Sequence, residues 1–244
     1  MHDRQDTGAE SRYFDEVAEH RSFDEFSTEQ YQRVLDRMLA EAPREPRVLD
    51  AGCGSGAWLS ALGARGVRAV GLELSPALAQ QAREEGLEVV VGDLLAPPQI
   101  GLFDAVVLCG VLHHFPAPAE RVKVLAGLTG MLAPGGTIAS IDPNGSNPFV
   151  QMAFRMHAEV SPNEVCLRHE DLLMAYDEAG LQVIEVERME ILQPRAPEGP
   201  LQRVWPALRR VALSTSRLLG AAAVGNYTVV VAGTCGDGRA RGGA

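Results

Sequence analysis

The amino-acid sequence predicts an α/β protein in which a doubly wound parallel β-sheet carries helices on both faces. Between residues 47 and 141, short apolar segments alternate with segments of helical character, a pattern typical of parallel strands joined by right-handed crossovers. Residues 103–108 are almost purely apolar, as expected of a central strand covered on both faces. At 48–56 an apolar run ends on an acid and breaks into three alternating glycines, which indicates a strand, a turn and a helix start that together can bind a ligand.

Each predicted element has a local signal. We expect strands at 47–51, 67–74, 87–91, 103–108, 137–141, 181–187 and 227–232, and helices at 55–65, 120–132 and 170–179. Gly66 is the expected left-handed cap of the first of these helices. Ser75 and Pro76 predict an N-cap followed by proline in the first turn of a further helix, which Gly86 ends. Residues 134–136 predict a turn.

The regions outside this pattern are expected to be less regular. We expect disorder at residues 1–12, and a helix capped by Ser27 that carries apolar residues at helical spacing from Tyr31 to Leu39. Another helix is expected around residues 149–156. The insertion 188–225 has an amphipathic segment, which we interpret as a lid or wall of the substrate pocket, with edge packing and a membrane-surface role as alternatives.

The length of 244 residues fits one large domain. We expect a single domain over 1–244, with a helical cap at 1–45, a cofactor-binding half at 46–142, a substrate-side half at 143–233 that contains the insertion, and a disordered tail at 234–244.

The amino-acid composition limits the classes of partner that we expect for this protein. A formal net charge of -10 argues against nucleic acid, because binding to phosphates requires a basic surface. The four cysteines form no CxxC pair or His/Cys cluster, so no metal is expected. No signal peptide or membrane-spanning apolar run is visible, so we expect a cytoplasmic protein without stable membrane insertion. The sequence leaves a homodimer open.

Three acids follow expected strands and narrow the kind of ligand. The glycines alone also fit a dinucleotide fingerprint, Gly52-x-Gly54-x-x-Ala57 with Glu73 further on. Asp50, Glu73 and Asp93, however, each stand at a strand end, where the ligand crevice of a doubly wound sheet forms. Carboxylates accept hydrogen bonds from ribose hydroxyls and from the adenine amine. An acid beneath the glycine turn favours an ammonium or sulfonium over a pyrophosphate.

With these motifs the sequence resembles the class I S-adenosylmethionine-dependent methyltransferases, from about Tyr13 to Gly233. The matching segments are VLDAGCGSG at 48–56, AVGLELS at 69–75, VGDLLAPP at 91–98, FDAVVLCGVLHHF at 103–115 and LAPGGTIASIDP at 132–143. The resemblance implies a Rossmann-like, seven-stranded sheet whose last strand runs antiparallel. It also implies that S-adenosyl-L-methionine is the cofactor and S-adenosyl-L-homocysteine the product.

The resemblance implies a role for each matching residue at the cofactor. Gly52, Gly54 and Gly56 pack against the methionine part, and Asp50 holds the loop and, through water, the amine of the cofactor. Glu73, with Leu74 beside it, binds the ribose, and Asp93 takes the adenine amine with Leu94 beside the ring. Cys109 contacts the methionyl end, and Tyr13 closes over the cofactor.

The segment after 103–108 carries the candidate catalytic groups. His113 and His114 lie on the cleft side in the family, and an imidazole can act as a base toward an acceptor hydroxyl near neutral pH. We expect His114 to be the base. The alternative is that the pair only holds the loop and packs on the ribose or the sheet.

We therefore expect a methyltransferase that acts on a small organic acceptor, with a hydroxyl oxygen preferred over carbon or nitrogen, in a family that resembles those of quinone and natural-product biosynthesis. Cys109-Gly110-Val111-Leu112 stands where methyltransferases of nucleic acid carry an Asn-Pro-Pro-Tyr type tetrapeptide. Two other classes remain as alternatives, an NAD-dependent oxidoreductase and a noncatalytic cofactor-binding module.

Overall fold

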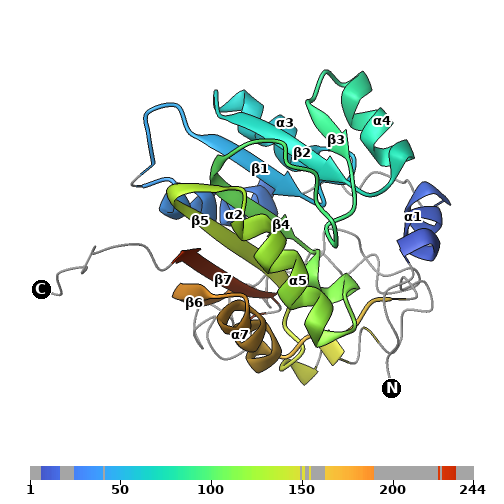
Figure 1. Ribbon diagram of the computed structural model, residues 1–244, viewed down its shortest axis with the longest axis vertical. Coiled ribbons are helices and arrows are strands. Elements are labelled where there is room, and N and C mark those ends of the chain that lie inside the picture. Colours follow the sequence, from blue (N-terminus) through green and yellow to red (C-terminus); the bar gives the residue numbers. More distant parts are fainter. Residues whose placement is uncertain are drawn as a thin grey trace, which may run out of the picture.

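A seven-stranded β-sheet in the order β3-β2-β1-β4-β5-β7-β6 organises the chain (Figure 1). The structure is a computed structural model that describes residues 7–16, 25–40, 42–148, 150–151, 154, 163–189, 225 and 227–234. Its strands are β1 (Arg47–Ala51), β2 (Arg68–Glu73), β3 (Val89–Val91), β4 (Phe103–Cys109), β5 (Leu132–Pro143), β6 (Leu181–Met189) and β7 (Tyr227–Thr234). The helices described are α1 (Thr7–Glu16), α2 (Glu25–Met38), α3 (Ala57–Ala64), α4 (Pro76–Glu84), α5 (Pro118–Thr129), α7 (His169–Glu178) and the short 3-10 helix η1 (Leu112–His114).

The sheet is parallel except for β7. Strand β1 pairs in parallel with both β2 and β4, and β4 pairs in parallel with β5. Strand β7 runs antiparallel to its neighbours β5 and β6. This arrangement confirms the predicted fold class, including the reversal of the last strand. It also places a topological switch point between β1 and β4, where ligands bind in open α/β sheets.

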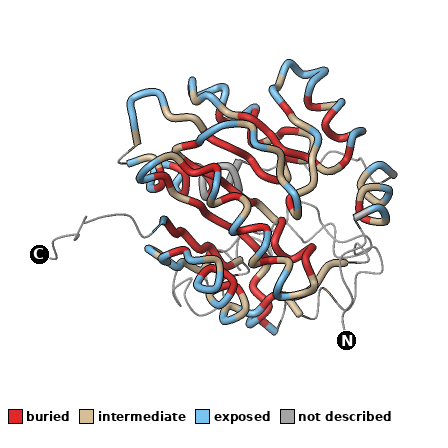
Figure 2. Tube along the Cα trace, viewed as in Figure 1, coloured by how far each residue is buried: buried red, intermediate tan, exposed pale blue. Residues whose placement is uncertain are grey.

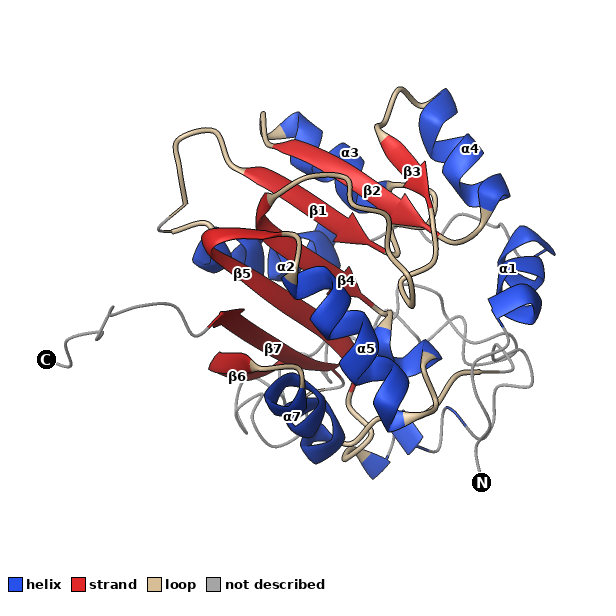
Figure 3. Ribbon diagram, viewed as in Figure 1, coloured by secondary structure: helices blue, strands red, loops and turns tan. Residues whose placement is uncertain are grey.

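Helices cover both faces of the sheet (Figure 3). Helices α5 and α7 pack on one face through buried residues such as Leu125 and Leu172. On the other face, α2 and α3 contribute Tyr31 and Trp58, whose rings meet edge to face with centroids 5.4 Å apart. The buried residues follow the central strands and the inward helix faces (Figure 2). Burial on both sides explains why Phe103–Cys109 is almost uniformly apolar.

Two expectations for the N-terminal region were wrong. Residues 7–12 belong to α1 and are not disordered. This helix packs against α4 and is held there by Asp15, which accepts hydrogen bonds from the Ser75 hydroxyl and from Ala77 N. Ser27 lies within α2 instead of capping it, because α2 begins at Glu25. A capping signal contributes only about 1 kcal/mol, and tertiary packing of an amphipathic helix outweighs it.

The start of β5 also differs from the prediction. Helix α5 ends at Thr129, and the predicted turn at 134–136 lies inside β5. The pairing of β4 with β5 moves from Phe103↔Leu132 to Ala105↔Thr137, so β5 carries extra residues at this point. Such a bulge keeps glycine and proline within a strand.

The other predicted elements inside the described residues are observed within one to three residues of their expected bounds. Ser75 caps α4 by accepting a hydrogen bond from Leu78 N, with Pro76 in the first turn. Gly66, Gly86 and Gly180 have positive φ after their helices. Most of 149–162, the segment 190–224 and residues 235–244 lie outside the described residues, together with our expectations for them.

Gly71 on β2 lets the strand lie close to the glycine turn. A Cβ at this position would stand 2.5 Å from Cys53 Sγ, 2.8 Å from Leu59 Cδ1 and 3.1 Å from Val89 Cγ2. We predict that Gly71→Ala lowers the free energy of unfolding by about 1–3 kcal/mol, the usual cost of overpacking. Gly63→Ala is the control, since a Cβ there on helix α3 meets nothing within 4 Å.

The control should leave the stability unchanged or raise it by up to about 1 kcal/mol, because alanine favours helix. Urea denaturation of both variants makes the comparison. Equal effects of the two substitutions would contradict the packing argument.

Candidate functional site

A cavity of about 190 Å³ opens at the carboxyl ends of β1, β2 and β4, at the switch point of the sheet. Ten of the predicted site residues line it: Tyr13, Asp50, Gly52, Gly54, Glu73, Leu74, Asp93, Leu94, Cys109 and His114. Two do not. Gly56 stands at the start of α3, where a Cβ would meet Leu87 and Ala82. His113 is buried beside His114, with the centroids of the two rings 4.2 Å apart.

The carboxylate of Glu73 connects two backbone segments at the edge of this cavity. Its Oε2 accepts a hydrogen bond from Gly54 N at 2.8 Å, and its Oε1 accepts one from Ser75 N at 2.8 Å. Burial raises the pKa of Glu73, and the backbone hydrogen bonds oppose this shift. Each carboxylate oxygen has a second lone pair. Glu73 can therefore hold the glycine turn and accept ligand hydroxyls at the same time.

Asp50 is a buried acid, and one oxygen of its carboxylate accepts no hydrogen bond from the described residues. Its side chain is 2% exposed, and Oδ2 has no hydrogen-bond partner among the described atoms. Burial, with a smaller contribution from the negative charge of Glu73, raises the pKa of Asp50 to about 7. A buried carboxylate without a donor is costly. A ligand that brings a cationic or hydrogen-bonding group would satisfy it.

The charge of the cavity selects against phosphates. Of the described residues that line it, four carry carboxylates, Glu10, Asp50, Glu73 and Asp93, and none is lysine or arginine. Asp93 Oδ1 accepts a hydrogen bond from Leu95 N at 2.8 Å, which shapes the turn after β3. A pyrophosphate would meet repulsion here, whereas a molecule with an ammonium, a sulfonium and ribose hydroxyls fits the donor and acceptor pattern.

The two histidines sit on η1, directly after β4. His113 Nδ1 lies 3.0 Å from Asp142 Oδ1, and the same oxygen accepts a hydrogen bond from the backbone N of His113 at 3.1 Å. Asp142 is fully buried near the end of β5. The ring of His113 is thus fixed by a carboxylate from the neighbouring strand.

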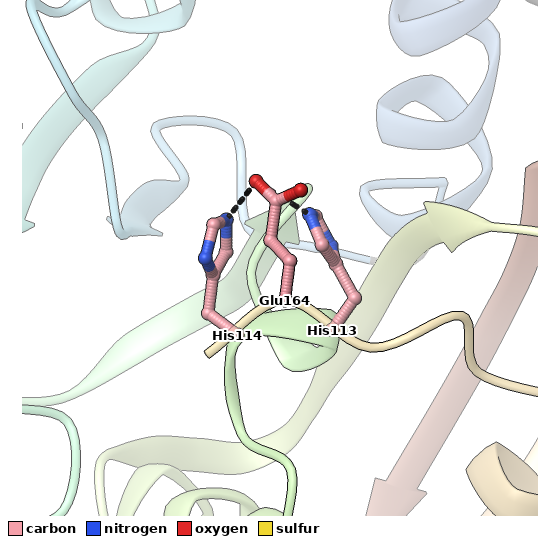
Figure 4. Close-up of side chains that lie close together, drawn as sticks. All are labelled: His113, His114 and Glu164. Atoms are coloured by element: carbon pink, nitrogen blue, oxygen red, sulfur yellow. Dashed lines mark ion pairs between the residues drawn. The ribbon is translucent and has the colours of Figure 1, made fainter. Parts of the chain in front are cut away.

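His114 faces a second pair of acids. Its Nδ1 lies 2.7 Å from Glu10 Oε1, and its Nε2 lies 3.7 Å from Glu164 Oε1 (Figure 4). Burial, followed by the neighbouring His113, lowers the pKa of His114, while Glu10 and Glu164 oppose the shift. The ring is therefore mainly neutral at pH 7 and can accept a proton or bind a cation.

Four residues of this region were not predicted from the sequence. Glu10 and Phe14 come from α1, and Phe14 meets the ring of His114 with centroids 5.3 Å apart. Glu10 stands at helical spacing from Tyr13 and Phe14, a signal that the expected disorder of residues 1–12 led us to miss. Asn163, which donates a hydrogen bond to Glu10 Oε2, and Glu164 lie in an irregular segment without any such signal.

Within the described ranges, no helix combines the length and apolar character needed to cross a bilayer. The expected cytoplasmic location stays a prediction.

The strand order with β7 reversed, the glycine turn and the acidic cavity together define a Rossmann-like domain of the class I S-adenosylmethionine-dependent methyltransferases. The chain belongs to the family described as "Methyltransferase domain", whose model matches residues 21–186. The cofactor of this class is S-adenosyl-L-methionine, and the open acceptor atom of Asp50 fits that ligand.

Curated relatives match about half of the chain or less. A ubiquinone biosynthesis O-methyltransferase of Xanthomonas campestris pv. campestris (strain B100) is 37% identical over 100 residues, which are 38% of this chain and 41% of the relative. A tRNA (carboxymethyluridine(34)-5-O)-methyltransferase of Xenopus tropicalis is 31% identical over 126 residues, 51% of this chain and 19% of the relative. The chain thus spans less than half the length of these relatives.

Solved structures share the fold at lower identity. A SAM-dependent methyltransferase from Archaeoglobus fulgidus superimposes with a TM-score of 0.58 at 18% identity, covering 84% of this chain and 93% of that one. A methyltransferase in complex with the Haloferax volcanii Trm112 activator gives 0.61 at 20% identity, with 96% and 99% coverage. The [4+2]-cyclase SpnF gives 0.59 at 18% identity, with 88% and 84% coverage.

The raised pKa of Asp50 gives a testable link between stability and pH. An unfolded aspartate titrates near pH 4, and folded Asp50 titrates at about 7. Between these values the folded state binds more protons, so the free energy of unfolding falls as pH rises and levels off above about pH 7. We predict that Asp50→Asn is more stable than the natural protein at pH 8, by on the order of 2 kcal/mol, and that this advantage disappears near pH 4.

Urea denaturation across pH measures the difference. Asp177→Asn, at an exposed position on α7, controls for the change in formal charge. A stability gain in Asp50→Asn that does not depend on pH would contradict the burial argument.

Proposed function

We propose that this protein transfers the methyl group of S-adenosyl-L-methionine to a hydroxyl oxygen of a small organic acceptor. One observation carries the proposal. His114, paired with Glu10, lines the same cavity as the glycine turn and the three acids at the strand ends. A hydroxyl placed beside His114 would therefore meet the methyl donor inside one buried pocket. Similarity to a ubiquinone biosynthesis O-methyltransferase supports the choice of oxygen.

In this proposal, residues at the carboxyl ends of β1, β2 and β3 would hold the cofactor. Gly52 and Gly54 allow close approach of the methionine part, and Asp50 accepts from its amine. Glu73 accepts from the ribose hydroxyls, and Asp93 accepts from the adenine amine. The remaining contacts with the cofactor would be apolar or aromatic and would come from Leu74, Leu94, Cys109 and Tyr13. Gly56 would not touch the cofactor and would instead contribute to the shape of the glycine turn.

The chemistry requires one bond to form and one to break. When bound, S-adenosyl-L-methionine supplies an electrophilic methyl group on a sulfonium. The acceptor oxygen forms a bond to the methyl carbon as the carbon–sulfur bond breaks, and the hydroxyl proton leaves the acceptor. Orientation within a buried pocket supplies much of the rate gain. His114 is the group at the acceptor side that can assist the loss of the proton.

The charge of the protein and the lining of the pocket also bear on the alternative acceptors, cofactors and reactions. Similarity to a tRNA methyltransferase raises tRNA as an acceptor, but the net charge of -10 disfavours it. The acidic lining disfavours NAD. Carbon or nitrogen methylation and a noncatalytic role remain alternatives, and the [4+2]-cyclase with this fold illustrates that the fold does not dictate the reaction. The homodimer also stays a prediction.

Calorimetric titration with S-adenosylhomocysteine, S-adenosylmethionine and NAD tests the cofactor assignment directly. Binding of the first two ligands and no binding of NAD is the expected result. Turnover is then screened with phenolic, quinol, carboxylate and amine acceptors and with tRNA. Methylation of tRNA alone would overturn the proposed acceptor class.

We predict that Glu73→Gln weakens binding of S-adenosylhomocysteine by about tenfold or more. The substitution removes charge-assisted hydrogen bonds and turns an amide group toward the backbone donors of Gly54 and Ser75. Calorimetry measures the affinity. Glu88→Gln, an exposed glutamate just before β3, is the matched control and should bind like the natural protein. Unchanged affinity in folded Glu73→Gln would remove Glu73 from the ribose site.

We predict that His114→Ala lowers kcat by about a hundredfold or more, the usual contribution of a group that handles a proton. Its affinity for S-adenosylhomocysteine should change less than threefold, because the cofactor contacts come from other residues. Steady-state kinetics with the acceptor found in the screen, together with calorimetry, separates the two effects. A variant with normal kcat would show that His114 only packs on the pocket.

A further inference from the structure

We propose that His113, His114 and Glu164 form a binding site for a divalent transition-metal cation beside the methyl-transfer pocket. The site itself is argued from the side chains, and its role in holding the acceptor rests on the proposed function. Within the described part of the chain, these three residues are a group whose ligand atoms all lie within 4.8 Å of one another.

The three candidate ligand atoms converge on one point. His113 Nε2 lies 4.0 Å and His114 Nε2 lies 3.7 Å from Glu164 Oε1 (Figure 4). These distances exceed a hydrogen bond. Two atoms bound at about 2.1 Å from one cation are at most about 4.2 Å apart, so rotation of these side chains would have to bring the three ligand atoms closer together than the 4.8 Å within which they now lie.

A carboxylate lies next to the other ring nitrogen, Nδ1, of each histidine. Asp142 Oδ1 faces His113 Nδ1 at 3.0 Å, and Glu10 Oε1 faces His114 Nδ1 at 2.7 Å. A proton on each Nδ1 leaves each Nε2 with a lone pair directed at Glu164. Metal-binding histidines nearly always donate their other ring N–H to a carboxylate or carbonyl in this way.

The charge of the surrounding side chains also supports a cation site. Glu10 and Asp142 are buried and the side chain of Glu164 is 10% exposed, so three carboxylates surround two imidazoles. A divalent cation bound among buried carboxyl groups would offset their negative charge.

The ligand types select the cation. Two imidazole nitrogens and one carboxylate oxygen suit zinc, iron, cobalt or manganese, whereas magnesium and calcium prefer oxygen ligands alone. Three protein ligands leave further positions on such a cation open. Because His114 lines the cofactor cavity, an acceptor hydroxyl can take an open position there. Coordination would lower the pKa of that hydroxyl and release its proton to water. With the cation bound, His114 would therefore act as a ligand in place of its role as a base.

The test uses the full chain, freed of metal with a chelator and titrated by calorimetry with Zn²⁺ and, for its visible spectrum, Co²⁺. We expect one equivalent bound at micromolar concentration or below. His113→Ala, His114→Ala and Glu164→Gln should each weaken binding by tenfold or more, with folding checked by circular dichroism. Asp142→Asn should weaken it by about 10- to 100-fold, as expected when a ligand loses its orienting partner.

His169→Ala is the matched control, because His169 lies on α7 outside the cluster, and it should bind like the natural protein. No binding, retention of binding in all three ligand variants, or loss of binding in His169→Ala would overturn the inference. Titration with S-adenosylhomocysteine in parallel separates the two proposals. Binding of S-adenosylhomocysteine without binding of a cation would overturn only the metal site. Binding of a cation without binding of S-adenosylhomocysteine or S-adenosylmethionine would overturn only the proposed function.

Discussion

The hydrogen bonds that Glu73 accepts from Gly54 and Ser75 are the interaction on which the pocket depends. One carboxylate at the end of β2 fixes both the glycine turn after β1 and the start of α4. The close approach of these segments requires Gly71 on β2, which leaves room for Cys53 and Leu59. A side chain that orders the backbone of its own site needs little reorganisation when a ligand arrives, and that pre-organisation favours tight binding.

The same arrangement has a cost in stability. Asp50 and Glu73 are both buried, and burial raises the pKa of each. The fold therefore tolerates negative charge that it would not need for folding alone. Such strain is common at functional sites, where selection for binding outweighs local stability. A cationic, hydroxyl-bearing cofactor would relieve it.

The region around His113 and His114 is assembled from segments far apart in the sequence. Helix α1 brings Glu10 to His114, the end of β5 brings Asp142 to His113, and the segment after residue 163 brings Glu164 between the two rings. Asn163 connects the first and third of these segments through its hydrogen bond to Glu10. The surroundings of the two histidines therefore depend on how α1, the end of β5 and the segment after residue 163 dock against η1.

The sequence alone determined the parallel part of the sheet and the meeting of three strand-end acids at one cavity. Glycines, capping residues and strand-end acids are local signals, and the register of a parallel sheet brings the ends of neighbouring strands together, so Asp50, Glu73 and Asp93 were predictable. Tertiary structure decided what surrounds the histidines. Helix α1 is ordered by its contacts with α4 and the pocket, and Glu164 lies in a segment without periodicity. Long-range docking of this kind leaves no pattern in the local sequence, because its energy comes from partners more than a hundred residues away for Glu10 and about fifty for Glu164.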